Sequence, residues 1–306
     1  MTAGGRSGAA ARTWPAAGGL VLSALVWGLS WWPVRHLQQL GVQPLWTTAL
    51  AYLPGALLVL LARPRALGQL RRSPELAVVA LSAGAANACF NLGVANGDVV
   101  RVVLLFYLMP VWATLLARPL LGERVDARAA LRLLLALSGA AIVLWPRHGG
   151  WPLPRQPADW FGLGGGVFFA LNNVMLRRNR EAGAAASMLA LFAGGLLCGA
   201  LLAWLLQAVA GAPALPPPQA AWLLPAGLFG LALTVAGFGL QYGAARLPAA
   251  LTAVVMMLEI VFASLSSALL GASHPGLRTL LGALLIGAGV LLGALAEAAA
   301  QPTAPG

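Results

Sequence analysis

The run Leu104 to Val125, LLFYLMPVWATLLARPLLGERV, decides the fold of this chain. It is apolar and long enough to cross a bilayer as a helix, which takes about 20 residues. A related run, VVMMLEIVFASLSSALLG, extends from Val254 to Gly271, and Leu108 aligns with Leu258 when the two are overlaid. A long apolar segment that recurs near the end of each half indicates an internal duplication, and a duplicated membrane chain is a candidate transporter.

The composition of the chain argues against a water-soluble globule. Of its 306 residues 60% are hydrophobic and only 9% are charged, and the mean hydropathy is +0.83. A soluble domain carries about 25% charged residues, so we expect the bilayer to solvate most of the surface. Backbone groups in hydrocarbon need internal partners, which leaves helices or a closed barrel. The apolar blocks are about 18 to 24 residues long, which favours helices over the shorter strands of a barrel.

Ten apolar blocks are predicted to span the membrane. Their expected ranges are 18–35, 44–62, 75–95, 99–117, 128–145, 160–177, 187–209, 220–243, 249–270 and 276–297. The widest link between blocks is rich in proline and falls at the middle of the chain. We therefore expect an all-α integral membrane protein of ten transmembrane helices in two five-helix repeats. Because five is odd, the second repeat must be inverted relative to the first.

These blocks set the expected domain boundaries. The expected units are a cytosolic N-terminal tail at 1–17, a first five-helix repeat at 18–146, a proline-rich outer linker at 147–159, a second five-helix repeat at 160–298 and a cytosolic C-terminal tail at 299–306.

The basic residues predict the orientation in the membrane. All 19 are arginines, and the formal net charge is +11. The links on the side of the N-terminus hold fourteen of them: Arg6, Arg12, Arg63, Arg65, Arg71, Arg72, Arg118, Arg124, Arg128, Arg132, Arg177, Arg178, Arg180 and Arg246. Because cytoplasmic links of membrane proteins are enriched in Lys and Arg, we expect both termini in the cytosol and a multi-pass protein of the cell (inner or plasma) membrane. This pattern also argues against a nucleic-acid partner.

Several short motifs resemble a known family. They are Val26-Trp27-Gly28, Tyr107 to Trp112 (YLMPVW) with Leu121 to Arg124 (LGER), Ala170-Leu171, Leu176 to Arg178, Leu258-Glu259 with Val261 to Ala263, and Leu284 to Leu291 (LLIGAGVL). In order and spacing they resemble EamA-type members of the drug/metabolite transporter superfamily. The resemblance implies ten helices around a central cavity, with the fifth and tenth at the periphery, and movement of small metabolites, often outward. Ile260 departs from the family, which often has proline there.

Glu259 is the main candidate for substrate binding, because it falls near the centre of its predicted span. A charge at that depth costs about 2.5–3.5 kcal/mol on insertion scales, so it should face a cavity or a partner. It would then bind a substrate ammonium group or carry a coupling proton. The alternative is a neutral glutamic acid that is hydrogen-bonded between helices.

Other polar and aromatic residues within the spans are candidates for the same cavity. They are Trp27, Ser30, Asn87, Asn91, Tyr107, Asn172, Asn173 and Gln241. Trp27, Trp31 and Tyr107 would form an aromatic wall for a cationic or apolar substrate. The amides have an equally good alternative role, because amides within membranes also hydrogen-bond neighbouring helices together.

Two further pairs of residues carry structural predictions. Pro54 and Pro110 lie inside predicted spans and should kink or break them. Asp98 and Arg101 lie three residues apart at the outer start of the fourth span, and this spacing places them on one helix face. We expect a local ion pair or a helix cap there, with an outer gate as the alternative.

The predicted function is that of a secondary transporter that moves a small organic metabolite by alternating access, most simply outward. The sequence has no HExxH motif and no Cys/His cluster, so neither a metal nor a cofactor is expected. The bilayer and a small-molecule substrate (an amino acid, an amine or a drug-like compound) are the expected partners, with proton coupling and a homodimer left open. The alternatives are an integral-membrane enzyme acting on lipid or a lipid-linked substrate, and a non-transporting scaffold.

Overall fold

The computed structural model describes residues 5–122, 127–145, 153–179, 181–247, 252 and 255–300. Within these ranges all regular elements are helices. In the first half they are α1 (Gly5–Leu29), α2 (Trp31–Gln39), α3 (Pro44–Ala62), α4 (Arg65–Arg72), α5 (Pro74–Asn96), α6 (Val99–Phe106), α7 (Met109–Leu121) and α8 (Ala127–Leu144). In the second half they are α9 (Pro157–Arg178), α10 (Ala184–Ala210), α11 (Ala220–Ala244), α13 (Leu258–Leu269) and α14 (Leu277–Ala300).

Six segments of the described chain are long and apolar enough to cross a membrane. They are Pro15–Gln39, Pro44–Ala62, Pro74–Asn96, Val99–Leu121, Ala184–Ala210 and Ala220–Ala244. The first segment joins α1 to α2 through Ser30, and the fourth joins α6 to α7 through Tyr107 and Leu108. Shorter apolar helices occur in α8, α13 and α14. The prediction of an all-helical membrane protein is therefore confirmed, whereas the count of ten crossings stays a prediction.

Proline and capping residues define where several helices begin. Pro44, Pro74 and Pro157 each occupy the first turn of a helix, where the missing N–H would have no helical partner. The Ser73 hydroxyl accepts a hydrogen bond from the backbone N–H of Leu76 at 3.2 Å and caps α5. These local signals account for the close match between the predicted and observed starts of α3 and α5.

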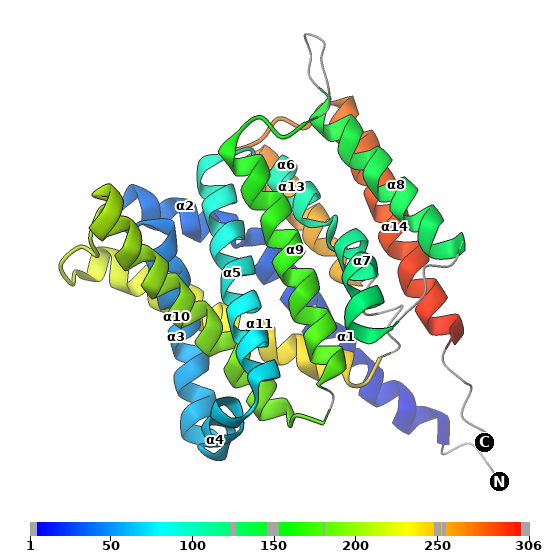
Figure 1. Ribbon diagram of the computed structural model, residues 1–306, viewed down its shortest axis with the longest axis horizontal. Helices are drawn as coiled ribbons and strands as arrows, with labels where there is room; N and C mark the ends of the chain where they lie inside the picture. The colour runs from blue at the N-terminus through cyan, green and yellow to red at the C-terminus, as the bar shows by residue number, and fades with distance from the viewer. Residues whose placement is uncertain are drawn as a thin grey trace.

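The first helix of each half packs against the other half. Helix α1 lies against α11 and α13, whereas α9 lies against α5, α6 and α7 (Figure 1). Small residues permit the close approach of α1 to α11, since a Cβ added at Gly19 would lie 2.9 Å from the carbonyl oxygen of Gly239. The two halves are therefore interlocked, because helices of one half pack on helices of the other.

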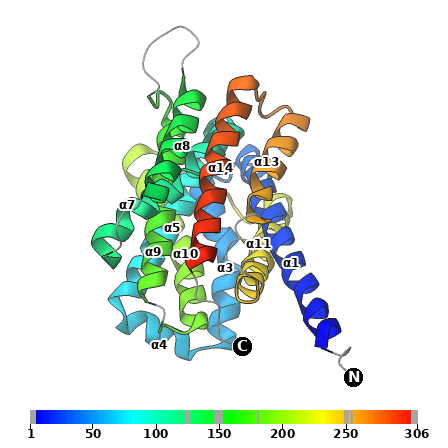
Figure 2. The same cartoon turned by 90° about the vertical axis from the view of Figure 1, so that its right-hand side faces the viewer.

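The remaining helices complete this arrangement. Helices α3 and α10 pack on each other, and α10 also packs on α5, while α3 also packs on α11. Helices α8 and α14 lie side by side at one edge of the molecule (Figure 1). Figure 2 shows α4 and the beginning of α1 at the same end of the molecule. The exposed arginines of α4 (Arg65, Arg71 and Arg72) thus lie at the end where the chain begins.

Candidate functional site

The helix of the fourth predicted span is interrupted within its apolar run. Tyr107 and Leu108 form a turn between α6 and α7, and Pro110 lies in the first turn of α7. Proline cannot donate the backbone hydrogen bond that would continue α6. The sequence therefore explains why one helix ends and another begins here.

An equivalent interruption lies in the second half. Helix α13 begins at Leu258, directly after a turn residue, Met257, and Glu259 lies in its first turn. In the overlay of the two apolar runs Leu108 aligns with Leu258, so both helix breaks occupy the same repeat position. The break in the second half forms without proline: Ile260 occupies the position that aligns with Pro110.

The two interruptions are in direct contact through Tyr107 and Glu259. The Tyr107 hydroxyl lies 2.9 Å from Oε2 of Glu259 and 3.2 Å from the backbone oxygen of Met256. The side chain of Tyr107 is buried, with 3% of its surface exposed. An O–H···O distance of 2.9 Å is that of an ordinary hydrogen bond, which a phenol can form with a carboxyl oxygen. The predicted carboxylate therefore has a partner from the opposite half.

The end of α1 also packs against the start of α13, next to Glu259. A Cβ added at Gly28 would lie 2.8 Å from the backbone oxygen of Glu259 and 2.7 Å from Cβ of Phe262. Trp27 is partly buried against the core, and the buried Ser30 hydroxyl donates to the Trp27 carbonyl at 2.6 Å. The structure thus brings the α1 end, the α6–α7 break and the α13 start together around Glu259.

Two of the predicted amides hydrogen-bond α5 to α3. Asn87 accepts a hydrogen bond from the Tyr52 hydroxyl at 2.6 Å, and its amide donates to the Ala83 carbonyl at 2.8 Å. The amide of the buried Asn91 donates to the Thr48 hydroxyl at 2.8 Å. These contacts favour a helix-bridging role for both residues.

The other three amides occupy different environments. Asn172 is buried and donates from α9 to the Val79 carbonyl of α5 at 2.9 Å. Asn173 and Gln241 are exposed. Among the predicted substrate-binding residues that the structure describes, Tyr107 is the one seen to bond to the side chain of Glu259. A cavity role for Asn173 and Gln241 stays a prediction.

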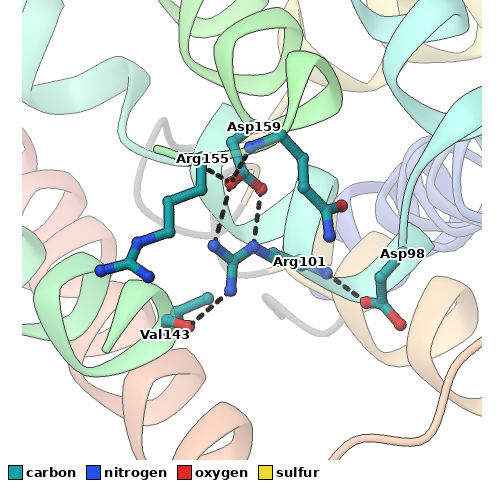
Figure 3. A network of polar contacts seen from close by, with 6 residues as sticks. Asp98, Arg101, Val143, Arg155 and Asp159 are labelled. Carbon is teal, nitrogen blue, oxygen red and sulfur yellow. Dashed lines mark hydrogen bonds and ion pairs between the residues drawn. The ribbon is translucent and has the colours of Figure 1, made fainter. Parts of the chain in front are cut away.

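Of the two local roles expected for Asp98 and Arg101, the structure shows the helix cap and not an ion pair between them. Oδ1 of Asp98 accepts from the backbone N–H of Arg101 at 2.8 Å, so Asp98 caps the helix (Figure 3). The Arg101 guanidinium instead binds both oxygens of Asp159, with Nε–Oδ1 at 2.6 Å and Nη2–Oδ2 at 2.9 Å. A cap carboxylate is directed at the backbone three residues on, which leaves the guanidinium to a more distant partner.

Asp159 is the residue that sequence reasoning missed. Its carboxylate is 1% exposed and also accepts from the backbone N–H groups of Arg155 and Gln156, while Arg101 donates further to the Val143 carbonyl at 3.1 Å. The cluster ties α6, α8 and α9 together (Figure 3). The local signal was a helix start, since Gln156 and Asp159 form a capping box around Pro157.

Pro54, the other predicted kink residue, lies inside α3. Its ring packs toward α11, because a Cβ added at Gly230 would lie 2.9 Å from Cγ of Pro54. Its effect on the helix direction stays a prediction.

Comparisons with known proteins agree with this arrangement. The family model of EamA-like transporters matches residues 14–145 and again residues 156–294. No curated protein matches the chain. A crystal structure, described only as that of a protein, is 19% identical over 95% of this chain and 99% of that chain, with a TM-score of 0.59, which shows a shared fold. The chain therefore belongs to the EamA-like transporter family, with one family unit in each half.

Proposed function

We propose that this chain is a secondary transporter that moves a small organic molecule out of the cell by alternating access. The single observation that carries the proposal is the contact of Tyr107 with Glu259. It joins the two helix breaks, one from each family unit, in the interior of the helical body. Broken helices at the interface of two repeats are where transporters of this kind bind substrate.

The proposed topology has ten crossings in two inverted units. The first unit comprises α1 with α2, α3, α5, α6 with α7, and α8. The second comprises α9, α10, α11, α13 with the residues before it, and α14. We propose a cell-membrane protein with its N-terminus in the cytosol, because the exposed arginines of α4 share an end with the beginning of α1. Ten crossings, an even number, would bring the C-terminus to the same side.

The proposed substrate contact is the carboxyl group of Glu259, which is bonded to Tyr107 and lies next to the end of α1 that carries Trp27. A carboxylate at this depth attracts an ammonium group, and an aromatic face adds a cation–π contribution of about 0.5–2 kcal/mol. We therefore propose an amine or an amino acid as the substrate class. The same carboxyl group would release a proton when the substrate binds, which is the simplest form of proton coupling.

Export from cells tests this proposal directly. Cells that express the protein are loaded with a mixture of amines and amino acids, and the outflow of each compound is measured. We expect Glu259→Gln to lower the outflow of the transported compound about tenfold or more, because the amide cannot pair with an ammonium group. Glu75→Gln makes the same chemical change at the start of α5 and is expected to leave outflow unchanged. Equal outflow from Glu259→Gln and wild-type cells would remove Glu259 from the site.

A further inference from the structure

The guanidinium of Arg35 hydrogen-bonds the C-terminal end of the neighbouring helix α5. Arg35 lies in α2 and is partly buried. Its Nε donates to the carbonyl of Val94 at 2.7 Å, and its Nη2 donates to the carbonyl of Gly97. The guanidinium also lies over the ring of Trp31, with Cζ 5.5 Å from the ring centroid. One side chain therefore holds two carbonyls at the C-terminal end of α5.

The chemistry of this end of α5 explains why an arginine binds there. The last carbonyls of a helix have no partner within the helix and carry the negative end of its dipole. The planar guanidinium can donate to two of them at once, which an ammonium group cannot. The neighbouring Asp98 carboxylate adds electrostatic attraction. Charge, the planar geometry of the guanidinium and its partial burial therefore all favour the binding of Arg35 to the Val94 and Gly97 carbonyls.

Arg35 joins two different packing groups. We define group one as α1 with its chain continuation α2 and the two helices that pack on α1, α11 and α13; group two is α9 with the helices that pack on it, α5, α6 and α7. Helices α3 and α10 connect the two groups, and α2 also packs on α5. Arg101 and Asp159 both belong to group two, so their ion pair stabilises one group internally. The Arg35 contacts run from group one to group two. A second contact of the same kind, from the Val100 N–H to the Ser273 hydroxyl at 3.4 Å, lies beside the start of α6.

We infer that Arg35 is a latch that holds the outer ends of the two groups together in this conformation. Opening of the outer pathway to Glu259 then requires that Arg35 release the Val94 and Gly97 carbonyls. The inference rests on the proposed transport function, because only an alternating-access protein needs such an opening. It assigns to Arg35 a conformational role rather than a contact with substrate.

A cysteine at Val103 reports on this opening. Val100, Val103 and Tyr107 lie three and four residues apart, so they share one face of α6. The backbone N–H of Val100 contacts Ser273, the Tyr107 hydroxyl contacts Glu259, and α6 packs on α13, so α6 lies at the boundary between the two groups. Val103 is 2% exposed in this structure. The reporter is Val103→Cys in a chain whose two cysteines are replaced (Cys89→Ser, Cys198→Ser), and the readout is its labelling rate with a membrane-impermeant thiol reagent added outside.

The expected result is faster labelling when the latch is removed. We expect Arg35→Ala to raise the rate about tenfold or more, since two charge-assisted hydrogen bonds are lost. Arg35→Lys should give an intermediate rate because one ammonium group cannot hold both carbonyls. Arg155→Ala removes an exposed arginine on the same side of the molecule and should leave the rate unchanged.

An unchanged labelling rate in Arg35→Ala would overturn the inference. Size-exclusion chromatography of the solubilised protein shows whether the variant is folded. If Arg35→Ala is not, Arg35→Lys decides, and a rate equal to that of the reporter chain alone would overturn the latch. The assay uses no substrate. Normal export by Glu259→Gln together with fast labelling of Arg35→Ala would therefore overturn the proposed site and leave the latch standing.

Discussion

Arg101 and Asp159 show how a single ion pair is maintained at the edge of an apolar helical body. Asp159 is 1% exposed and Arg101 is 27% exposed, and every oxygen of the carboxylate has a donor. A buried charge is tolerated only when it is paired and fully hydrogen-bonded. Removing either partner alone would leave the other charge without its partner, and this penalty is the main way in which the pair affects stability.

Removing the carboxylate of Asp159 should be costly. We expect Asp159→Ala to lower the stability by about 3 kcal/mol, the low end of the range for a broken buried pair, because Arg101 is partly exposed. Asp98→Ala removes a helix cap and a through-space attraction to Arg35, without leaving a buried charge unpaired, and should cost about 1 kcal/mol. Thermal unfolding of the solubilised variants measures both. A Tm of Asp159→Ala at or above that of Asp98→Ala would contradict the assigned roles.

The helices as units were largely predictable from the sequence. The ranges of α3 and α5 agree closely with the predicted spans, because apolar block length and proline at a helix start are local signals. The break near Pro110 follows from proline chemistry in the same way. The break at Met257 has no such signal, since Ile260 can continue a helix. From Ile260 the sequence predicts a straighter helix here than at Pro110, and the break is seen only in the structure.

Contacts between distant segments were beyond local reasoning. Asp159 lies 58 residues from Arg101, and no periodicity in either segment links them. The interlocked packing of α1 and α9 was also unforeseen, because repeats identified in a sequence do not show which helices of each half pack together. The candidate site was predicted in part, since Glu259 and Tyr107 were both named but their contact was not.

The close approach of α1 to α13 depends on the absence of a side chain at Gly28. We expect Gly28→Ala to lower export and Tm, because the new Cβ would lie under 3 Å from Phe262 and from Glu259. Gly18→Ala is the matched control in the same helix, where an added Cβ meets nothing within 4 Å. Alanine is the better helix former, so this variant should be as stable as wild type or slightly more stable. Equal effects of the two substitutions would contradict the packing assigned to Gly28.

At the scale of the whole molecule, the packing groups differ from the family units. The group around α1 contains α11 and α13 from the second half, and the group around α9 contains α5, α6 and α7 from the first half, so each group is built from both family units. The Tyr107–Glu259 contact and the contacts of Arg35 with the C-terminal end of α5 both run between the groups. A relative tilt of the two groups would open one side of Glu259 while closing the other.

Labelling of a cysteine at position 259 tests this arrangement most directly. Glu259→Cys, in the chain with Cys89→Ser and Cys198→Ser, is placed in right-side-out and in inside-out membrane vesicles. A membrane-impermeant thiol reagent is then added to each preparation. We predict labelling in both, slower in right-side-out vesicles and accelerated there by Arg35→Ala. Absence of labelling in both preparations, under conditions where the solubilised and denatured variant reacts, would show that Glu259 lies off any aqueous pathway and would contradict the proposed transport mechanism.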